Sequence, residues 1–454
     1  MKALTLITTL VLSLHLLAAE KPNVLFIIAD DLNDFPTYMG RYPDAKTPNL
    51  DTLAARGMAF QNAHCQYPLC GPSRASFMTG MHPLTLGYTT HMTDEALQKK
   101  AGQMGTSLLH SYFSKHGYKT MAVGKICHKH VPKGSVDLSG GRGDFSAGLG
   151  RLGKHWNVKG TSTDWAAAPE KDVQMPDYEA AQWAIERLQE KHEKPFMLMV
   201  GFLRPHVPWY VPQKWYDLYP DVNTLTKPPY RKDDLNDVPE ISKKLNIDPR
   251  MPTTEELKLR GQWGDLLQSY LACASFTDHY IGEVLKALED SPYKENTIIV
   301  LISDHGYHMG EKNTFQKHSL WERSSHVPMV IAGPGVKPGQ SSKAPVGLID
   351  LYPTLLDLCG LPANAKNEGN SLLPLIQDPD LKWEHPVLTS WQGNNIAVQD
   401  EQYRYIRYDS GEEELYDHSK DLNEWNNLAT DPRLDGVKKR LAAEMLQPKA
   451  KPER

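Results

Sequence analysis

Short apolar runs alternate along the chain with longer segments whose apolar residues recur at spacings of three and four. Five runs are apolar almost throughout: residues 23–29, 119–124, 195–202, 297–303 and 327–332. Such runs are typical of strands buried on both faces of a mainly parallel sheet. The helical spacing occurs over residues 48–56, 178–191, 262–290 and 348–358. The alternation predicts an α/β fold, a large mixed, mainly parallel sheet sandwiched by helices.

Two regions depart from this pattern. Residues 210–260 are rich in Pro, Lys and Asp and lack a clear period, so we expect an insertion near the mouth of a site. In the tail, residues 403–408 and 414–416 read as strands joined by a turn, and residues 435–445 as a helix. These elements predict a smaller C-terminal antiparallel sheet plus helix. We therefore expect domains over residues 20–365 and 366–454.

The N-terminus has the layout of a cleavable secretory signal. Lys2 precedes an apolar stretch over residues 3–17, which ends in the small residues Ala18 and Ala19. A membrane anchor is the alternative, but this stretch is shorter than the ~20 residues that span a bilayer. We expect a signal peptide over residues 1–19, a periplasmic or secreted protein, and no stable membrane insertion.

Composition and charge exclude several classes of protein and of function. The 454 residues are 40% hydrophobic, enough for a large core, which argues against disorder and coiled coil. Lys plus Arg number 50 against 55 Asp plus Glu, a net charge of −5. This balance argues against nucleic-acid binding, and any anionic ligand must be held by a local site. Five cysteines, an odd number, cannot all pair in a disulfide framework.

Acidic residues follow two of the predicted strands. Asp30 and Asp31 come after the first, and Asp304 and His305 after the fourth. The carboxyl ends of parallel strands meet at one edge of a sheet, so these side chains should converge. Like charges brought together repel unless a cation lies among them, and oxygen ligands suit Ca²⁺ or Mg²⁺. Asp is also a common turn and cap residue, which is the alternative.

The segment around Cys70 carries a candidate nucleophile. Pro72 is placed where the first turn of a helix tolerates proline, so Cys70 would lie at the positive end of that helix. Arg74, four residues on, would face the same side. A nucleophilic anion and an anionic substrate are both favoured there. The alternatives are a buried Cys at a helix cap, or a disulfide between Cys65 and Cys70.

Two motifs resemble those of type I sulfatases of the alkaline phosphatase superfamily. Cys70-Gly71-Pro72-Ser73-Arg74, followed by Thr79-Gly80, is similar to Cys-x-Pro-Ser-Arg, in which the Cys is oxidised to formylglycine. Residues 117–125 match the second signature, Gly-Tyr-x-Thr-x-x-x-Gly-Lys. Further pieces follow in family order, so the resemblance covers the whole mature chain.

Within that family the chain resembles the iduronate-2-sulfatase-like branch. His128 lies three residues after Lys125, one further than in most sulfatases, and His305 stands where Asn is commoner. Residues 204–208 (RPHVP) and Lys317 also match the branch in position.

The resemblance implies a metal and a modified residue. One Ca²⁺ would be held by Asp30, Asp31, Asp304, His305 and residue 70. A formylglycine-generating maturation enzyme would act on Cys70. The aldehyde, as its hydrate, would attack sulfur and later release sulfate as the aldehyde returns.

The resemblance also assigns roles around the sulfate. Arg74 and Lys125 would neutralise charge on the sulfate oxygens, and His128 would lie beside the nucleophile. His206 and Lys317 would bind on the leaving-group side, with His206 favoured as the acid. Next to motif residues, four further side chains are candidates for sugar contacts: Trp209, Tyr210, His308 and Gln316.

These inferences predict a sulfuric ester hydrolase, with sugars from sulfated polysaccharides as the expected substrates and 2-O-sulfated uronic acid as one candidate. Two alternatives stay open: a phosphodiesterase or phosphonate monoester hydrolase of the same superfamily, and a catalytically silent glycan-binding homologue. Cys127 and Cys273 are expected in the core. Cys65 and Cys359 are left open between free thiol and disulfide.

Overall fold

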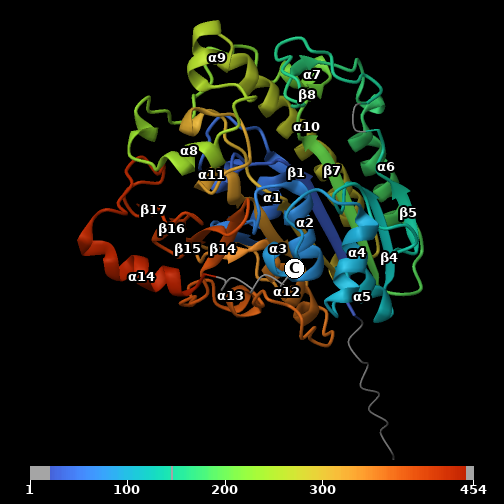
Figure 1. The fold of residues 1–454 in the computed structure, drawn as a ribbon. Coiled ribbons are helices and arrows are strands. Elements are labelled where there is room, and N and C mark those ends of the chain that lie inside the picture. Colours follow the sequence, from blue (N-terminus) through green and yellow to red (C-terminus); the bar gives the residue numbers. More distant parts are fainter. Residues whose placement is uncertain (1–20, 145–146, 446–454) are drawn as a thin grey trace, which may run out of the picture.

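A computed structural model describes residues 21–144 and 147–445, with an eight-stranded sheet at its centre (Figure 1). The predicted signal peptide lies outside the described residues. The strand order is β12-β2-β11-β9-β1-β7-β4-β5. The five predicted runs form β1 (Asn23–Asp30), β4 (Lys119–Gly124), β7 (Phe196–Pro205), β9 (Thr297–Ser303) and β11 (Met329–Ala332). The other three strands are β2 (Gly57–Phe60), β5 (Leu138–Gly141) and β12 (Gln340–Ser342).

The central strands β9, β1, β7 and β4 run parallel, whereas β11 is antiparallel to both of its neighbours. The sheet is therefore mixed and mainly parallel, as predicted. Each central strand is buried on both faces, which explains its continuous apolar sequence.

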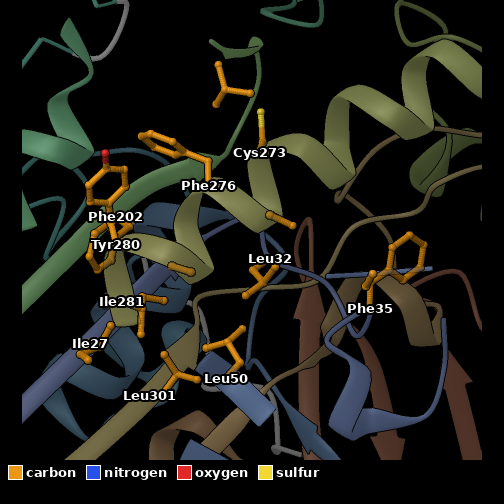
Figure 2. Close-up of a cluster of buried hydrophobic side chains, with 14 of the residues drawn as sticks. Ile27, Leu32, Phe35, Leu50, Phe202, Cys273, Phe276, Tyr280, Ile281 and Leu301 are labelled. Atoms are coloured by element: carbon orange, nitrogen blue, oxygen red, sulfur yellow. The ribbon is translucent and has the colours of Figure 1, made fainter. Parts of the chain in front are cut away.

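Alternate residues of β1 face two separate cores. Leu25 and Ile27 pack toward α1 (Pro48–Ala55), α6 (Pro176–Gln189) and α10 (Trp263–Glu289). Phe26 and Ile28 pack toward α2 (Cys70–Thr79), α5 (Leu109–Lys115) and α12 (Leu351–Leu358). Figure 2 shows the first core, in which Cys273 of α10 is buried as expected. The four helical segments read from the sequence are α1, α6, α10 and α12.

The expected insertion holds several short elements: β8 (Trp209–Val211), α7 (Gln213–Tyr216), α8 (Glu240–Asn246) and α9 (Thr254–Arg260). The C-terminal region forms a four-stranded antiparallel sheet of β14 (Val387–Trp391), β15 (Asn395–Gln399), β16 (Tyr403–Arg407) and β17 (Glu413–Asp417). Helix α14 (Asp435–Ala443) contacts β15 and β16. Strands β16 and β17 were predicted, and β14 and β15 were missed. No helix in the described ranges has the length and hydropathy to cross a membrane.

Candidate active site

Four neighbouring parallel strands place polar residues at one edge of the sheet. Strand β1 ends at Asp30, β9 is followed by Asp304, β7 by His206 and β4 by Lys125. The predicted convergence of strand ends is therefore present, because the carboxyl ends of these strands share an edge.

Cys70 is the first residue of α2, which confirms the helix predicted from Pro72. Its Sγ lies 3.2 Å from His305 Nε2, 3.1 Å from Lys317 Nζ and 4.0 Å from Asp31 Oδ1. All five cysteines are buried free thiols, so the alternative Cys65–Cys70 disulfide is not formed and Cys359 is unpaired. The Cys70 side chain thus lies among acidic and basic groups at the positive end of α2.

The predicted metal ligands, together with His206, which was not predicted as a ligand, form two overlapping groups. Asp30, Cys70, Asp304 and His305 place ligand atoms within 4.8 Å of one another, and so do Asp30, Asp31, Cys70 and His206. Asp30 Oδ1 and Asp31 Oδ2 are buried and accept no hydrogen bond within the described chain. Buried carboxylate oxygens without a donor suit a hard cation, so these residues fit a Ca²⁺ ion.

The turn after β1 is held in a left-handed conformation. Asp31 has φ of 65°, which Asp tolerates better than most residues. Its N–H donates to Asp304 Oδ1 at 3.2 Å, and Tyr270 Oη donates to its carbonyl oxygen at 2.9 Å. These contacts fix the two strand ends to one another and to α10.

Burial and opposite charges compete to set the protonation of two neighbouring carboxyl groups, Asp30 and Asp31. Burial raises the pKa of Asp30, but Lys125, whose Nζ is 2.5 Å away, together with His206 and Arg74, brings that pKa well below its usual range. Burial also raises the pKa of Asp31, and there the charges of Lys317 and His305 do not offset it. Asp31 therefore gains most from an additional cation beside it.

His305 points Nε2 at the same centre. Nδ1 donates to the Gly306 carbonyl at 3.0 Å, and Nε2 lies 3.2 Å from Asp31 Oδ1. Burial lowers the pKa of His305, but Asp304, Cys70 and Asp31 outweigh burial and raise it to about 9. A proton and a metal ion are alternative occupants of that nitrogen lone pair.

Arg74 lies behind the ligands, away from the cavity. The side chain is fully buried, and Nε donates to Asp304 Oδ2 at 2.8 Å. Nη2 lies 3.4 Å from Asp30 Oδ1, and Nη1 donates to the Lys125 and Ile126 carbonyls. Arg74 therefore acts on the site through the two carboxylates that it holds.

A cavity of about 420 Å³ opens in front of Cys70. Among its lining residues are five side chains predicted from the sequence: Cys70, Lys125, His128, His206 and Lys317. The lining residues that were not predicted include six with larger side chains: His91, Arg142, Asp248, Arg250, Met251 and His318. Three of the six lie in the insertion over residues 210–260, which the sequence placed at the site mouth. His91 and Arg142 carry no comparable signal in the sequence.

The cavity's basic groups differ in charge. Burial lowers the pKa of Lys317, but Asp31, Cys70 and Asp30 raise it well above its usual range, so the ammonium group persists. Burial and the charge of Lys317 hold the pKa of His206 well below its usual range. Its Nδ1 donates to the Val207 carbonyl at 2.6 Å, so the neutral ring turns Nε2 toward Asp31, 3.9 Å away.

The four residues suggested for sugar contacts lie outside the lining. Trp209 is buried against Tyr270 and Tyr307, and Nε1 donates to the Pro205 carbonyl at 2.7 Å. His308 is buried with Nε2 3.0 Å from Ser319 Oγ. Tyr210 and Gln316 are likewise buried, in hydrogen bonds to Asp164 and to the 246–248 backbone. Their proximity to the motifs in sequence reflects packing behind the site, and none offers a surface to a sugar.

Comparison with known proteins identifies the family. Residues 22–361 match the family described as Sulfatase, and residues 310–451 match N-sulphoglucosamine sulphohydrolase, C-terminal. The chain belongs to the sulfatase family. Members of this family use a metal and a formylglycine. Its resemblance to the iduronate-2-sulfatase-like branch is also supported, because the chain is 31% identical to iduronate 2-sulfatase of Mus musculus over 433 residues, covering 81% of this chain and 76% of that protein.

Other sulfatases and solved structures extend the comparison. A sulfatase of Formosa agariphila is 45% identical over 426 residues, covering 90% of this chain and 83% of that protein. A structure described as a 2-O GAG sulfatase has a TM-score of 0.72 at 24% identity, with 93% and 91% of the chains covered. A phosphonate monoester hydrolase of Agrobacterium radiobacter has a TM-score of 0.74 at 20% identity, covering 93% and 94%. The fold alone therefore does not separate sulfate from phosphonate chemistry.

Proposed function

We propose that this sulfatase removes sulfate from sugars derived from sulfated polysaccharides, with residue 70 as formylglycine and one Ca²⁺ ion. The observation that carries the proposal is the position of Cys70 Sγ, 3.1 Å from Lys317 Nζ and 3.2 Å from His305 Nε2, at an open cavity lined by basic residues. Formylglycine supplies an aldehyde whose hydrate attacks sulfur and whose re-formation releases sulfate. Ca²⁺ would be held by Asp30, Asp31, Asp304, His305 and residue 70.

The side chains around residue 70 have distinct tasks. Lys125 and Lys317 present ammonium groups where the sulfate oxygens would lie, which favours the developing negative charge. His128, neutral because burial and its neighbours lower its pKa to about 3, can accept a proton from a hydroxyl on residue 70.

Two groups can supply the proton that the departing sugar oxygen needs. We assign this role to His206, which must first gain a proton at Nε2, as an anionic sulfate beside it favours. Lys317 already holds its proton and is the alternative. His206→Gln should impair sugar sulfates far more than aryl sulfates, because only a poor leaving group needs protonation. An equal loss of activity toward both classes of substrate would instead assign the role of general acid to Lys317.

The substrate proposal rests on the cavity and on the relatives. An open, basic cavity suits an anionic saccharide, and the names of two relatives refer to 2-O-sulfated or iduronate substrates. The test is sulfate release from a panel of sulfated disaccharides by enzyme co-expressed with a formylglycine-generating enzyme. We expect cleavage of a 2-O-sulfated uronic acid and none by Cys70→Ala. Activity on aryl sulfates alone would overturn the glycan assignment.

Two further measurements address the alternatives and the cofactors. Faster turnover of phosphate or phosphonate esters than of sulfate esters would favour the phosphonate hydrolase function. Peptide mass analysis of the Cys70 segment should show formylglycine, whereas an unconverted Cys in protein from the native host would favour a glycan-binding role. Ca²⁺ titration should raise the melting temperature of the wild type and leave Asp31→Asn unchanged.

We also propose export to the periplasm or the medium. The Lys2 and residue 3–17 pattern supports this proposal. N-terminal sequencing of protein from the native host should begin near Glu20, and an intact Met1 in a cytoplasmic fraction would contradict it.

A further inference from the structure

One wall of the cavity is a pair of stacked imidazoles. The ring of His91 lies face to face with that of His128, with centroids 3.8 Å apart and planes 9° from parallel. Both line the cavity with Cys70; His91 is exposed and His128 is half-buried. Within the described chain no hydrogen bond to the His128 ring is found, and the stacked face of His91 is a contact that can orient this ring.

The two segments that carry these rings are locked together. Asp94, at the start of α4 (Asp94–Gln103), is buried three residues after His91. Its carboxylate accepts the N–H groups of Lys129 and His130, at 3.2 and 2.8 Å, immediately after His128. His130 Nδ1 in turn donates to the Gly124 carbonyl at 2.6 Å, at the end of β4. These hydrogen bonds tie the segment that carries His91 to the segment that carries Lys125 and His128.

Gly71 leaves room for His91 beside the nucleophile. A Cβ on Gly71 would lie only 2.9 Å from His91 Nδ1, closer than side-chain carbons normally approach. The φ of Gly71 is not in the left-handed region, so the backbone conformation does not require a glycine here. The missing side chain is needed instead to leave room for the His91 ring. Position 71 is the variable position of the Cys-x-Pro-Ser-Arg motif, and here its size is matched to His91.

The surroundings keep both rings neutral. Burial, then the charges of Lys317 and Lys125, lower the pKa of His91 to about 4. Burial, then His91 and Lys125, lower the pKa of His128 to about 3. Two neutral imidazoles can stack closely, whereas two cations would repel.

We propose that His91 is a positioning residue that holds the neutral His128 ring beside residue 70. This inference rests on sulfate-ester hydrolysis at that residue. His91→Ala should lower kcat by about 10- to 100-fold, because a misplaced group reacts poorly, and should change KM little. His91→Phe should restore most of the kcat because it restores the stacked face.

A double-mutant cycle tests whether His91 acts through His128. In a His128→Ala background, His91→Ala should cause no further loss of kcat. Gly71→Ala should displace the ring and lower kcat, and adding it to His91→Ala should cost nothing more. The formylglycine content of each variant is measured by peptide mass analysis, and its folding by melting temperature. His116→Ala, which removes a ring stacked on Tyr112, is the matched control and should leave kcat unchanged.

Three outcomes would overturn the proposal. These are additive losses in the His128→Ala background, a His91→Phe variant as impaired as His91→Ala, or a rise in KM at unchanged kcat, which would indicate direct substrate contact. A wild type without sulfatase activity would instead overturn the proposed function.

Discussion

Arg74 shows how much of the site one buried side chain can organise. Its planar guanidinium contacts Asp30 at the end of β1, Asp304 just after β9, and the backbone after β4. A fork of donors in fixed geometry can hold several acceptors at once, which a single ammonium group cannot. The motif identified Arg74 as important, but only the structure shows that it acts through the carboxylates.

Arg74→Lys should therefore behave as a severe change despite conserving charge. We expect a loss of kcat on the order of 100-fold, because the carboxylates that it spaces would shift. Steady-state kinetics on matured enzyme give the loss, and melting temperature shows whether the variant folds. Arg187→Lys on α6, where the arginine pairs with Glu186 and Glu190 at the surface, should keep wild-type kinetics. Activity of Arg74→Lys near that control would refute the role.

At the scale of elements, sequence pattern is informative where burial is complete. The central strands β1 and β9 were found because residues buried on both faces form continuous apolar runs. Strands β14 and β15 were missed because VLTSW and NIAVQ are short and mix polar with apolar residues. Asp30 and Asp304 were predictable as residues at parallel strand ends. His91 was not, since a loop brings it to His128 and only the space at Gly71 admits it.

Helix α1 depends on a residue distant in sequence for its N-terminal capping. Thr47 at its N-cap makes no side-chain cap, and Asp278 of α10 accepts the N–H groups of Asn49 and Leu50, at 3.2 and 2.8 Å. Asp278→Ala should lower the free energy of unfolding by about 1–3 kcal/mol, since it leaves buried donors without an acceptor. Urea unfolding measures the loss, and activity should be retained. Asp290→Ala, which removes an exposed ion pair with Lys286, is the control, and an equal loss in both would contradict the capping role.

Across the whole molecule, buried charges and aromatic rings join the C-terminal sheet to residues 317–322, beside the active-site cavity. Arg404 of β16 pairs with Glu322 and, at 3.0 Å, with Glu424. Trp391 of β14 stacks on His318, with centroids 5.2 Å apart, next to Lys317. The C-terminal sheet therefore supports one wall of the active-site cavity.

Arg404→Leu should weaken the attachment of the C-terminal sheet to the rest of the protein. Removing one partner of a buried ion pair leaves uncompensated carboxylates, at a cost of about 3–5 kcal/mol. We expect lower stability and, because His318 loses its support, lower kcat/KM; limited proteolysis should cut between the two sheets sooner. Arg407→Leu, on the same strand but only half-buried, should behave like the wild type. Unchanged proteolysis of Arg404→Leu would show that the rings alone hold the sheet.

The pH dependence of the free energy of unfolding reflects buried carboxyl groups outside the active site as well as within it. Asp350, just before α12, accepts the N–H groups of Gly347 and Asn370 at 2.8 and 2.7 Å, yet burial raises its pKa to about 7. The folded state therefore holds a proton that the unfolded chain releases near pH 4. The stability from this group is complete below pH 4, falls as pH rises, and is lost above about pH 7.

This linkage makes a measurable difference between pH 5 and pH 8. Over that interval the wild type should lose about 2–3 kcal/mol of unfolding free energy through Asp350, whereas Asp350→Asn cannot titrate and should lack this component. Urea unfolding at each pH gives both curves, and their difference cancels the other titrating groups. Asp357→Asn, exposed on the same helix, should run parallel to the wild type. A parallel curve for Asp350→Asn would mean that its backbone hydrogen bonds keep Asp350 ionised throughout, with burial the weaker effect.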